Sequence, residues 1–325
     1  MLGDSTFRKE LLEAADFFER RIKPPPAADS APAPRANPTA PDTSQLRPLS
    51  GALPSPPHLR LPSLAYFYNE HMVPALPAVL DGVVDGWPAY STRPWSDLAY
   101  LKRAAGHRTV PVEHGAHYLD DAFDERLMRL SDFIEQHLEA APPGARPRAY
   151  LAQHALFEQC PRLRRDIVQP DYCLLTLDDG SGDDDGDGDD DDEQTDSATH
   201  TAEPPRVSAT ANVRVNAWLG PAGTLSPLHF DRSHNLLAQV VGSKYIRLYE
   251  PRHSACLYPH ESGPHQVSSR IIDPDDADVA SRFPRFCEAP YVDLVLRAGE
   301  CLYIPPGWWH MVEAREMSFS VSFWW

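Results

Sequence analysis

The chain has 325 residues, of which 42% are hydrophobic and 10% aromatic, so it can bury the core of one large domain or two ordinary ones. Its net charge is -17, but twelve acidic residues lie between positions 178 and 196, and without that run the net charge is only -5. This balance argues against a basic nucleic-acid-binding face, and the chain has no run of 18 apolar residues to span a membrane.

The cysteines and the amino terminus bear on the compartment. Five cysteines are scattered without a CxxC spacing, which favours a reducing, intracellular environment. The first residues lack the apolar stretch of a signal peptide. Because the chain also lacks a clear basic nuclear-import cluster, the sequence leaves nucleus and cytoplasm open, and it leaves the oligomeric state open as well.

The amino-terminal part divides into a short helix and a linker. Hydrophobic residues recur at helical spacing from Phe7 to Phe18, which predicts an amphipathic helix within residues 1–23. Twelve of the 39 residues from 24 to 62 are proline, mixed with Ala and Ser. We expect a disordered spacer of polyproline II character there, in preference to an SH3-type ligand. The folded domain should then span residues 63–325.

The first half of this domain is expected to supply flanking helices around a β-rich core. Hydrophobic side chains from Leu127 to Leu138 would form one face of a helix. The segments 150–154 and 172–175 bracket a Pro-rich helical turn. In chain order the pattern predicts a helix at 64–68, a strand at 77–84, a helix at 95–104, a strand at 108–113 and a helix at 126–138.

An aspartate-rich run, residues 178–203, interrupts the domain. It opens like the calcium loop of an EF-hand, with Asp183, Asp185 and Asp187 at alternating positions. Gln194 replaces the glutamate expected at the twelfth position, and the neighbouring residues give no pair of flanking helices. We therefore expect a disordered, solvated insertion that could attract a basic substrate by long-range electrostatic steering.

From Val213 onward the chain changes to short β-rich segments separated by Gly and Pro turns, which predicts an antiparallel barrel or jelly roll. Hairpin turns are expected at Val241–Lys244 and Arg297–Glu300, where glycine relieves backbone strain. The predicted strands are 214–219, 236–241, 245–249, 292–296, 301–304 and 318–324.

A short His-x-Asp motif, His229 and Asp231, is the most informative chemical signal. Residues i and i+2 of a strand share a face, so both side chains can point into a barrel, and His310 could join them from a later strand. Two imidazoles and one carboxylate are the ligands of a facial triad, which holds Fe(II) and leaves the opposite face open. The competing interpretation is a solvated surface pair and an unrelated core histidine. A second pair, His260 and His265, is better explained as part of a surface loop.

Five co-linear motifs carry a family resemblance: Asn216-Ala-Trp-Leu-Gly-Pro, Ser226-Pro-Leu-His-Phe-Asp, Gly242-Ser-Lys-Tyr-Ile-Arg-Leu-Tyr, Leu257-Tyr-Pro-His and Ser318-Phe-Ser-Val-Ser-Phe-Trp-Trp. Together they resemble the jumonji-C (JmjC) hydroxylases, which are Fe(II)- and 2-oxoglutarate-dependent oxygenases. The similarity covers roughly residues 64–325, including the upstream segments 108–113 and 150–154. It implies a mainly β fold, a double-stranded β-helix or cupin-like jelly roll, with flanking N-terminal helices. Phe230 departs from the pattern, because relatives often carry a polar residue there.

The resemblance also implies roles for individual residues. His229, Asp231 and His310 would bind the metal, and Lys244 would pair with the far carboxylate of 2-oxoglutarate. Without the resemblance, Lys244 would simply be a solvent-exposed turn lysine. The other implied positions are Tyr150, Ser226 and Asn235 around the co-substrate, and Glu113 and Trp218 in the substrate pocket.

The implied chemistry consumes O2 and 2-oxoglutarate, releases succinate and CO2, and hydroxylates a substrate C–H bond. A carboxylate at Glu113 suits a guanidinium, so we expect an arginine side chain of a protein or peptide as substrate. Two alternatives stay open: demethylation of N-methyl-lysine in histones, which releases formaldehyde, and a non-catalytic JmjC scaffold. The acidic balance makes a nucleic-acid substrate unlikely, and no membrane partner is expected.

Overall fold

The computed structural model describes residues 53–140, 149–177, 206–207 and 212–325. The amphipathic helix expected in residues 1–23, most of the proposed linker, and the acidic insertion with its EF-hand-like loop all lie outside these ranges. Within the described part of the chain, no helix is long and apolar enough to cross a membrane.

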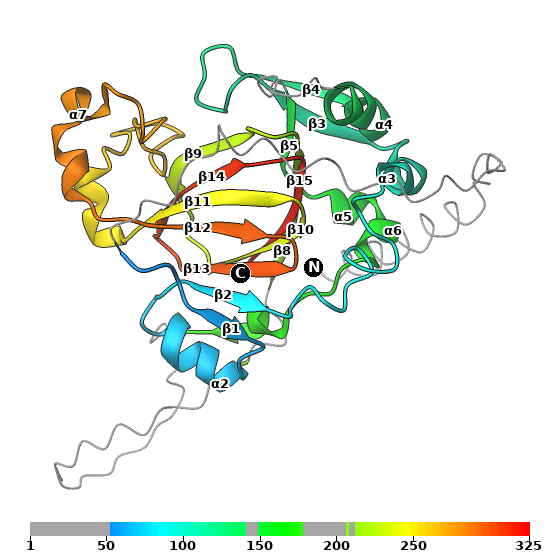
Figure 1. Cartoon of the computed structure of the whole chain (residues 1–325), viewed down its shortest axis with the longest axis horizontal. Helices are drawn as coiled ribbons and strands as arrows, with labels where there is room; N and C mark the ends of the chain where they lie inside the picture. Colours follow the sequence, from blue (N-terminus) through cyan, green and yellow to red (C-terminus); the bar gives the residue numbers. More distant parts are fainter. Residues whose placement is uncertain (1–52, 141–148, 178–205, 208–211) are drawn as a thin grey trace, which may run out of the picture.

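The larger of two central β-sheets has nine strands, and its strand pairs are antiparallel apart from β1 with β2 (Figure 1). In sheet order its strands are β1 (His58–Arg60), β2 (Ala78–Asp81), β13 (Glu300–Ile304), β10 (Asn235–Val241), β15 (Ser318–Trp324), β8 (Arg214–Gly220), β5 (Ala149–His154), β3 (Thr109–His114) and β4 (Asp124–Arg129).

A smaller antiparallel sheet of four strands lies beside the larger one (Figure 1). A separate two-stranded ladder joins β6 (Leu175–Thr176) to β7 (Arg206–Val207), so the backbone is paired just before and just after the acidic insertion. The strands of the smaller sheet, in order, are β12 (Val292–Arg297), β11 (Ser243–Tyr249), β14 (Trp309–Ala314) and β9 (Leu225–Phe230).

From β8 to β15, consecutive strands alternate between the two sheets except β11 and β12, which pair within the smaller sheet, and this arrangement confirms the predicted jelly roll. β10 lies in the larger sheet and β11 in the smaller one, and β12 and β13 change sheets in the opposite direction. The expected hairpins at Val241–Lys244 and Arg297–Glu300 are therefore wrong, because these turns are corners between sheets. The expected glycine role is right: Gly242 and Gly299 have φ values of +73° and +98°, which other residues rarely adopt.

The helices are short and flank the sheets. The predicted helix 126–138 is wrong in its first part, because residues up to Arg129 pair with β3 as the edge strand β4 and expose Leu127. The helices are α2 (Leu64–Phe67), α3 (Leu98–Ala105), α4 (Leu130–Phe133), α5 (Leu156–Gln159), α6 (Pro161–Arg164) and α7 (Val279–Arg282), with π-helical turns η2 (Tyr68–Met72) and η3 (Ile134–Glu139) and 3-10 turns η4 (Asp171–Leu174), η5 (Pro251–Cys256) and η6 (Pro284–Glu288).

The amino-terminal edge of the domain begins earlier than expected. Residues 58–60, placed in the linker by composition, form β1 and pair in parallel with β2. Proline is compatible with such an edge, since prolines 56 and 57 precede the paired residues.

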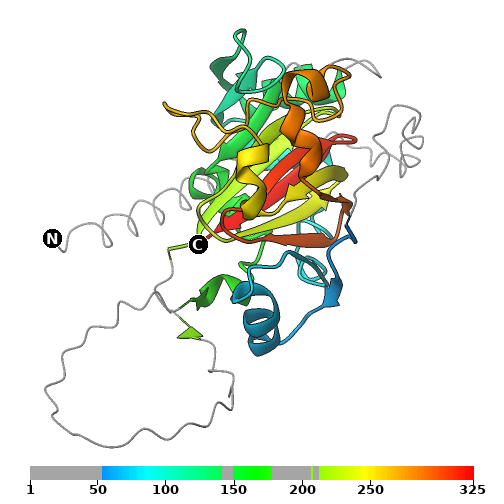
Figure 2. The same cartoon turned by 90° about the vertical axis from the view of Figure 1, so that its left-hand side faces the viewer.

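Three hydrophobic clusters hold the sheets and helices together. The largest packs the helices against the larger sheet, with Trp95 stacked on Phe319 at 4.3 Å between ring centroids. A second cluster lies between the two sheets. A third packs the segment 251–289 on the outer face of the smaller sheet, through residues such as Tyr249 and Trp309. In Figure 2 this segment, yellow to orange, faces the viewer. The second cluster fills part of the space between the sheets, and polar side chains line a cavity in the rest of it.

Candidate metal centre and adjoining cavity

The triad residues lie on two adjacent strands of the smaller sheet. His229 is near the end of β9, Asp231 follows that strand, and His310 is the second residue of β14. His310 stands directly opposite His229 in the β9–β14 ladder. The pairing of distant strands therefore brings His310 to His229 and Asp231, which lie 81 and 79 positions before it in the chain.

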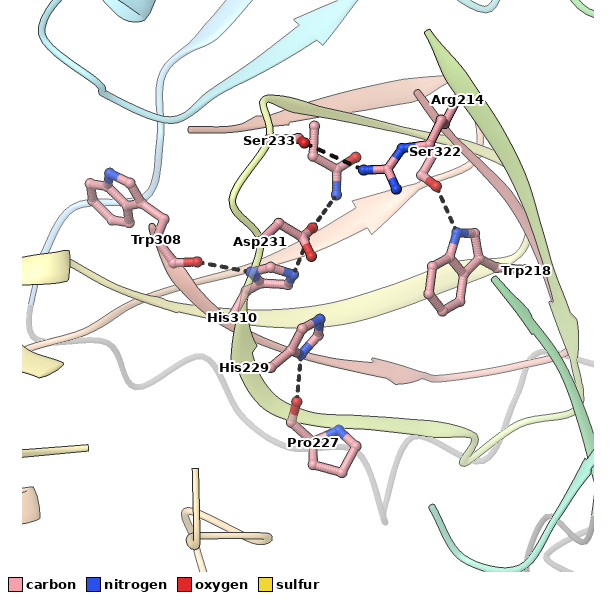
Figure 3. A network of polar contacts seen from close by, with 10 residues as sticks. Arg214, Trp218, Pro227, His229, Asp231, Ser233, Trp308, His310 and Ser322 are labelled. Carbon is pink, nitrogen blue, oxygen red and sulfur yellow. Dashed lines mark hydrogen bonds and ion pairs between the residues drawn. The ribbon is translucent and has the colours of Figure 1, made fainter. Parts of the chain in front are cut away.

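The three side chains point toward one another (Figure 3). Their ligand atoms all lie within 4.8 Å of one another. Nε2 of His310 is 3.7 Å from Oδ2 of Asp231, and the ring centroids of His229 and His310 are 4.2 Å apart. Two imidazoles and a carboxylate converge on one point, a donor set that suits a divalent transition metal.

Backbone carbonyl groups fix which nitrogen of each imidazole faces this point. Nδ1 of His229 lies 2.7 Å from the oxygen of Pro227, and Nδ1 of His310 lies 3.0 Å from that of Trp308. A carbonyl oxygen only accepts, so each Nδ1 carries the proton and leaves Nε2 free as a ligand. Burial, reinforced by His310, lowers the pKa of His229 to about 4, so its ring is neutral as metal binding requires.

A β-bulge allows both Ser226 and His229 to face the interior. In a regular strand, residues three apart project from opposite faces. Between the pairs His310–His229 and Val312–Ser226, β9 contains one residue more than β14. The extra residue reverses the alternation, so both side chains line the same cavity.

A cavity lies between the two sheets and contains the triad at its wall. Of the site residues expected from sequence, only Glu113 does not line it. Asn235 supports the triad, since its Nδ2 donates to Oδ2 of Asp231 at 3.2 Å, while its own Oδ1 is buried without a partner. The lining residues are Tyr150, Trp218, Ser226, His229, Asp231, Asn235, Leu237, Lys244, Ile304, His310, Val312, Ser322 and Trp324.

Lys244 is a buried lysine that lines this cavity. Its side chain is 2% exposed, and its ammonium donates to the hydroxyl of Tyr150 at 3.2 Å. The hydroxyl of Tyr150 is also hydrogen-bonded to Ser226. Burial lowers the pKa of Lys244 to about 7, and no carboxylate among the described residues pairs with it. The cavity therefore includes a site suited to an anion.

Glu113 lies in a second, adjoining pocket, which shares Tyr150 with the first. Its carboxylate is half-buried, and burial together with the nearby Glu125 raises its pKa to about 7. Trp218, also expected in the substrate pocket, lines the main cavity, and its Nε1 donates to Oγ of Ser322 at 2.9 Å.

Several cavity residues were not identified from the sequence. Trp324 and Ser322 stand opposite Asn235 and Leu237 in the β10–β15 ladder, so they reach the cavity by strand register alone. Only the alternation of β15 offered a signal, because it puts positions 322 and 324 on one face.

One further group among the described residues could hold a metal: His58, Asp81 and Glu300 on the adjacent strands β1, β2 and β13. Its histidine is 53% exposed and already lies 3.3 Å from Asp81. His260 and His265, considered as a second metal pair, have ring centroids 6.1 Å apart and join no such group. The buried triad is thus the better formed of the two candidate sites.

The fold and the converging donors define a cupin-like protein with a candidate metal centre inside the barrel. Residues 64–325 match the family model described as "Cupin-like domain". The chain belongs to the cupin-like JmjC family, whose members in general depend on Fe(II) and 2-oxoglutarate.

Curated relatives agree with this assignment. JmjC domain-containing protein D of Dictyostelium discoideum is 41% identical over 264 residues, which are 81% of this chain and 54% of that protein. Lysine-specific demethylase 8 of Xenopus tropicalis is 41% identical over 270 residues, 83% of this chain and 52% of the relative. A more distant human relative, named bifunctional peptidase and (3S)-lysyl hydroxylase JMJD7, is 25% identical over 81% of both chains. The chain spans just over half the length of the first two.

Proposed function

We propose that the chain is an Fe(II)- and 2-oxoglutarate-dependent protein hydroxylase that acts on an arginine side chain. One observation carries the proposal: a 2-His-1-carboxylate set and a buried lysine line the same cavity, and no carboxylate among the described residues pairs with that lysine. A metal at the first and an anion at the second would lie within one cavity.

The donor chemistry fits Fe(II). His229, Asp231 and His310 would hold the ion through two neutral imidazole nitrogens and one carboxylate, leaving positions open on the side of the cavity. When bound, iron supplies the redox centre at which O2 and 2-oxoglutarate react. The carbonyl groups behind the two rings and the amide of Asn235 keep these donors oriented.

The co-substrate site follows from charge and hydrogen bonding. Lys244 would pair with the far carboxylate of 2-oxoglutarate, and that anion would offset the desolvation of its ammonium. Three further polar residues line the same cavity as Lys244: Tyr150, Ser226 and Asn235. The Oδ1 atom of Asn235 is buried and has no hydrogen-bond partner among the described residues. These groups would orient the co-substrate and restrict the entry of water.

The substrate would approach from the pocket of Glu113. A half-buried carboxylate that has no cationic partner among the described residues suits a guanidinium, which it can bind through paired hydrogen bonds. Trp218 forms a wall of the main cavity, against which the side-chain carbons could lie.

Mass spectrometry tests the reaction. Arginine-containing peptides are incubated with the full chain, Fe(II), 2-oxoglutarate and O2, and succinate is measured in parallel. We expect a product heavier by one oxygen, with stoichiometric succinate, and neither with Asp231→Ala. No oxidised peptide and no succinate from the wild type would refute the proposal.

Lysine demethylation is the second candidate, because a 41%-identical relative is named a lysine-specific demethylase. The two reactions differ in product, since demethylation releases formaldehyde. A formaldehyde assay on methylated histone peptides separates them: release at a rate matching succinate formation would favour demethylation over arginine hydroxylation.

A further inference from the structure

We infer that Glu125, on the edge strand β4, is a second substrate-specificity residue, and that it and Glu113 together bind one guanidinium at the entrance to the cavity. This inference deepens the proposed function and rests on it. It concerns how the cationic side chain of the substrate is recognised.

The strand register aligns a row of side chains that leads into the cavity. Glu125 of β4 stands directly opposite Glu113 of β3, and Glu113 stands directly opposite Tyr150 of β5. Directly opposed residues of antiparallel strands project from the same face, with Cβ atoms about 4.5–5.5 Å apart. Tyr150 in turn accepts from Lys244 at 3.2 Å and lines the cavity of the triad.

Exposure falls steadily along this row. Glu125 is exposed, Glu113 is half-buried and Tyr150 is 8% exposed. The row therefore runs from solvent at the sheet edge to the wall of the metal cavity. A long side chain laid beside this row would bring its charged end to the carboxylates, close to the wall of the metal cavity.

The two carboxylates repel each other in the absence of a ligand. Like charges placed directly opposite in a sheet destabilise it. Among the described residues, neither Glu113 nor Glu125 has a side-chain hydrogen bond or an ion pair, and the nearby His154 has a pKa lowered by burial, which favours its neutral form. The raised pKa of Glu113 is a consequence of this arrangement. A cation between the carboxylates would remove the repulsion.

A guanidinium fits two carboxylates better than an ammonium does. It presents five N–H donors in a plane, so one edge can bind Glu113 while the remaining donors reach Glu125. An ammonium is a compact point charge with three donors and cannot match both carboxylates in the same way. The row thus favours arginine over lysine.

Asp124 provides a matched control. It precedes Glu125 on the same strand and carries the same charge, but the period of two turns it to the opposite face, where Arg126 holds its carboxylate at 2.7 Å. Glu125→Gln and Asp124→Asn therefore remove the same charge from neighbouring positions, only one of which faces the row.

The test measures binding of fluorescently labelled short peptides to the full chain, loaded with Fe(II) and 2-oxoglutarate without O2. The peptides carry a single arginine, lysine or citrulline in the same position. Glu125→Gln should weaken arginine-peptide binding by roughly two- to fivefold, the range of an exposed charge pair. It should leave the citrulline peptide unchanged, and Asp124→Asn should change neither.

A melting curve distinguishes recognition from a structural role. Because the substitution removes a repulsion, the unliganded Glu125→Gln protein should melt no lower than the wild type. Replacing a residue with a structural role would instead lower the melting temperature. Unchanged arginine binding in Glu125→Gln, an equal loss in Asp124→Asn, or lysine binding as tight as arginine binding would each overturn the inference. Binding is measured without turnover, so a peptide that binds as expected but is never oxidised would refute the proposed reaction alone.

Discussion

Replacing Lys244 with methionine should stabilise the unliganded protein while abolishing its response to 2-oxoglutarate. Methionine keeps an unbranched apolar side chain of similar length and removes the ammonium. In the folded chain this ammonium is 2% exposed and has one neutral hydrogen-bond partner, the hydroxyl of Tyr150. The residue is therefore costly to the empty protein and useful only when an anion is bound.

The pKa shift sets the size of the effect. Burial lowers the pKa of Lys244 from 10.5 to about 7, which at about 1.4 kcal/mol per unit is at most about 5 kcal/mol of unfavourable free energy. Since the folded-state pKa is the lower one, this cost is full below pH 7 and disappears as the pH rises from 7 to 10.5. Lys244→Met should therefore melt several degrees higher than the wild type below pH 7, and the difference should shrink at higher pH.

Thermal unfolding with and without 2-oxoglutarate is the assay, supported by calorimetric titration of the metal-loaded protein. Removing one partner of a buried charge pair costs about 2–5 kcal/mol, so the Kd for 2-oxoglutarate should rise by about 30-fold or more. The co-substrate should raise the melting temperature of the wild type and leave that of the variant unchanged. A variant that is less stable than the wild type below pH 7, yet binds 2-oxoglutarate equally well, would refute the reasoning.

Three further predictions concern the support of the triad, the substrate pocket and a corner of the barrel. Asn235→Ala should weaken metal binding by about 10- to 100-fold, because Asp231 loses the amide that orients it; an unchanged metal titration would contradict this. Binding of an arginine peptide should strengthen as the pH rises through about 7, where the carboxyl group of Glu113 ionises, and Glu113→Gln should flatten that profile. Gly242→Ala should destabilise the fold in urea unfolding by about 1–3 kcal/mol or more, since φ is +73° and the new Cβ would lie 2.2 Å from the oxygen of Met317; a stability equal to that of the wild type would show that this corner can relax.

Much of the metal site was predictable because metal binding requires particular residue types, histidine and aspartate, at particular spacings. His229 and Asp231 are two apart, and His310 follows a Pro-Gly turn that leads into a strand. Their convergence depends on the pairing of β9 with β14. The number of strands between them in the chain is compatible with this pairing but does not determine it. Lys244 shows the opposite case: beside a glycine turn it looks exposed, and only its position on the inner face of β11 buries it.

The errors share a cause, which is that strand pairing is a tertiary property. Residues 126–129 carry helix-compatible spacing, yet hydrogen bonding to β3 makes them a strand. The corners at Gly242 and Gly299 have the sequence of hairpins, but their strands pair with different neighbours. The bulge that turns Ser226 inward has no sequence signature that could be separated from an ordinary strand.

Anaerobic titration of Fe(II) into the full chain tests the central claim, that His229, Asp231 and His310 bind one iron ion. The account predicts one tight site per chain, lost in Asp231→Ala and His310→Ala, retained in His58→Ala, and required for 2-oxoglutarate binding. Iron bound equally well by Asp231→Ala, or lost only when His58 is replaced, would contradict it.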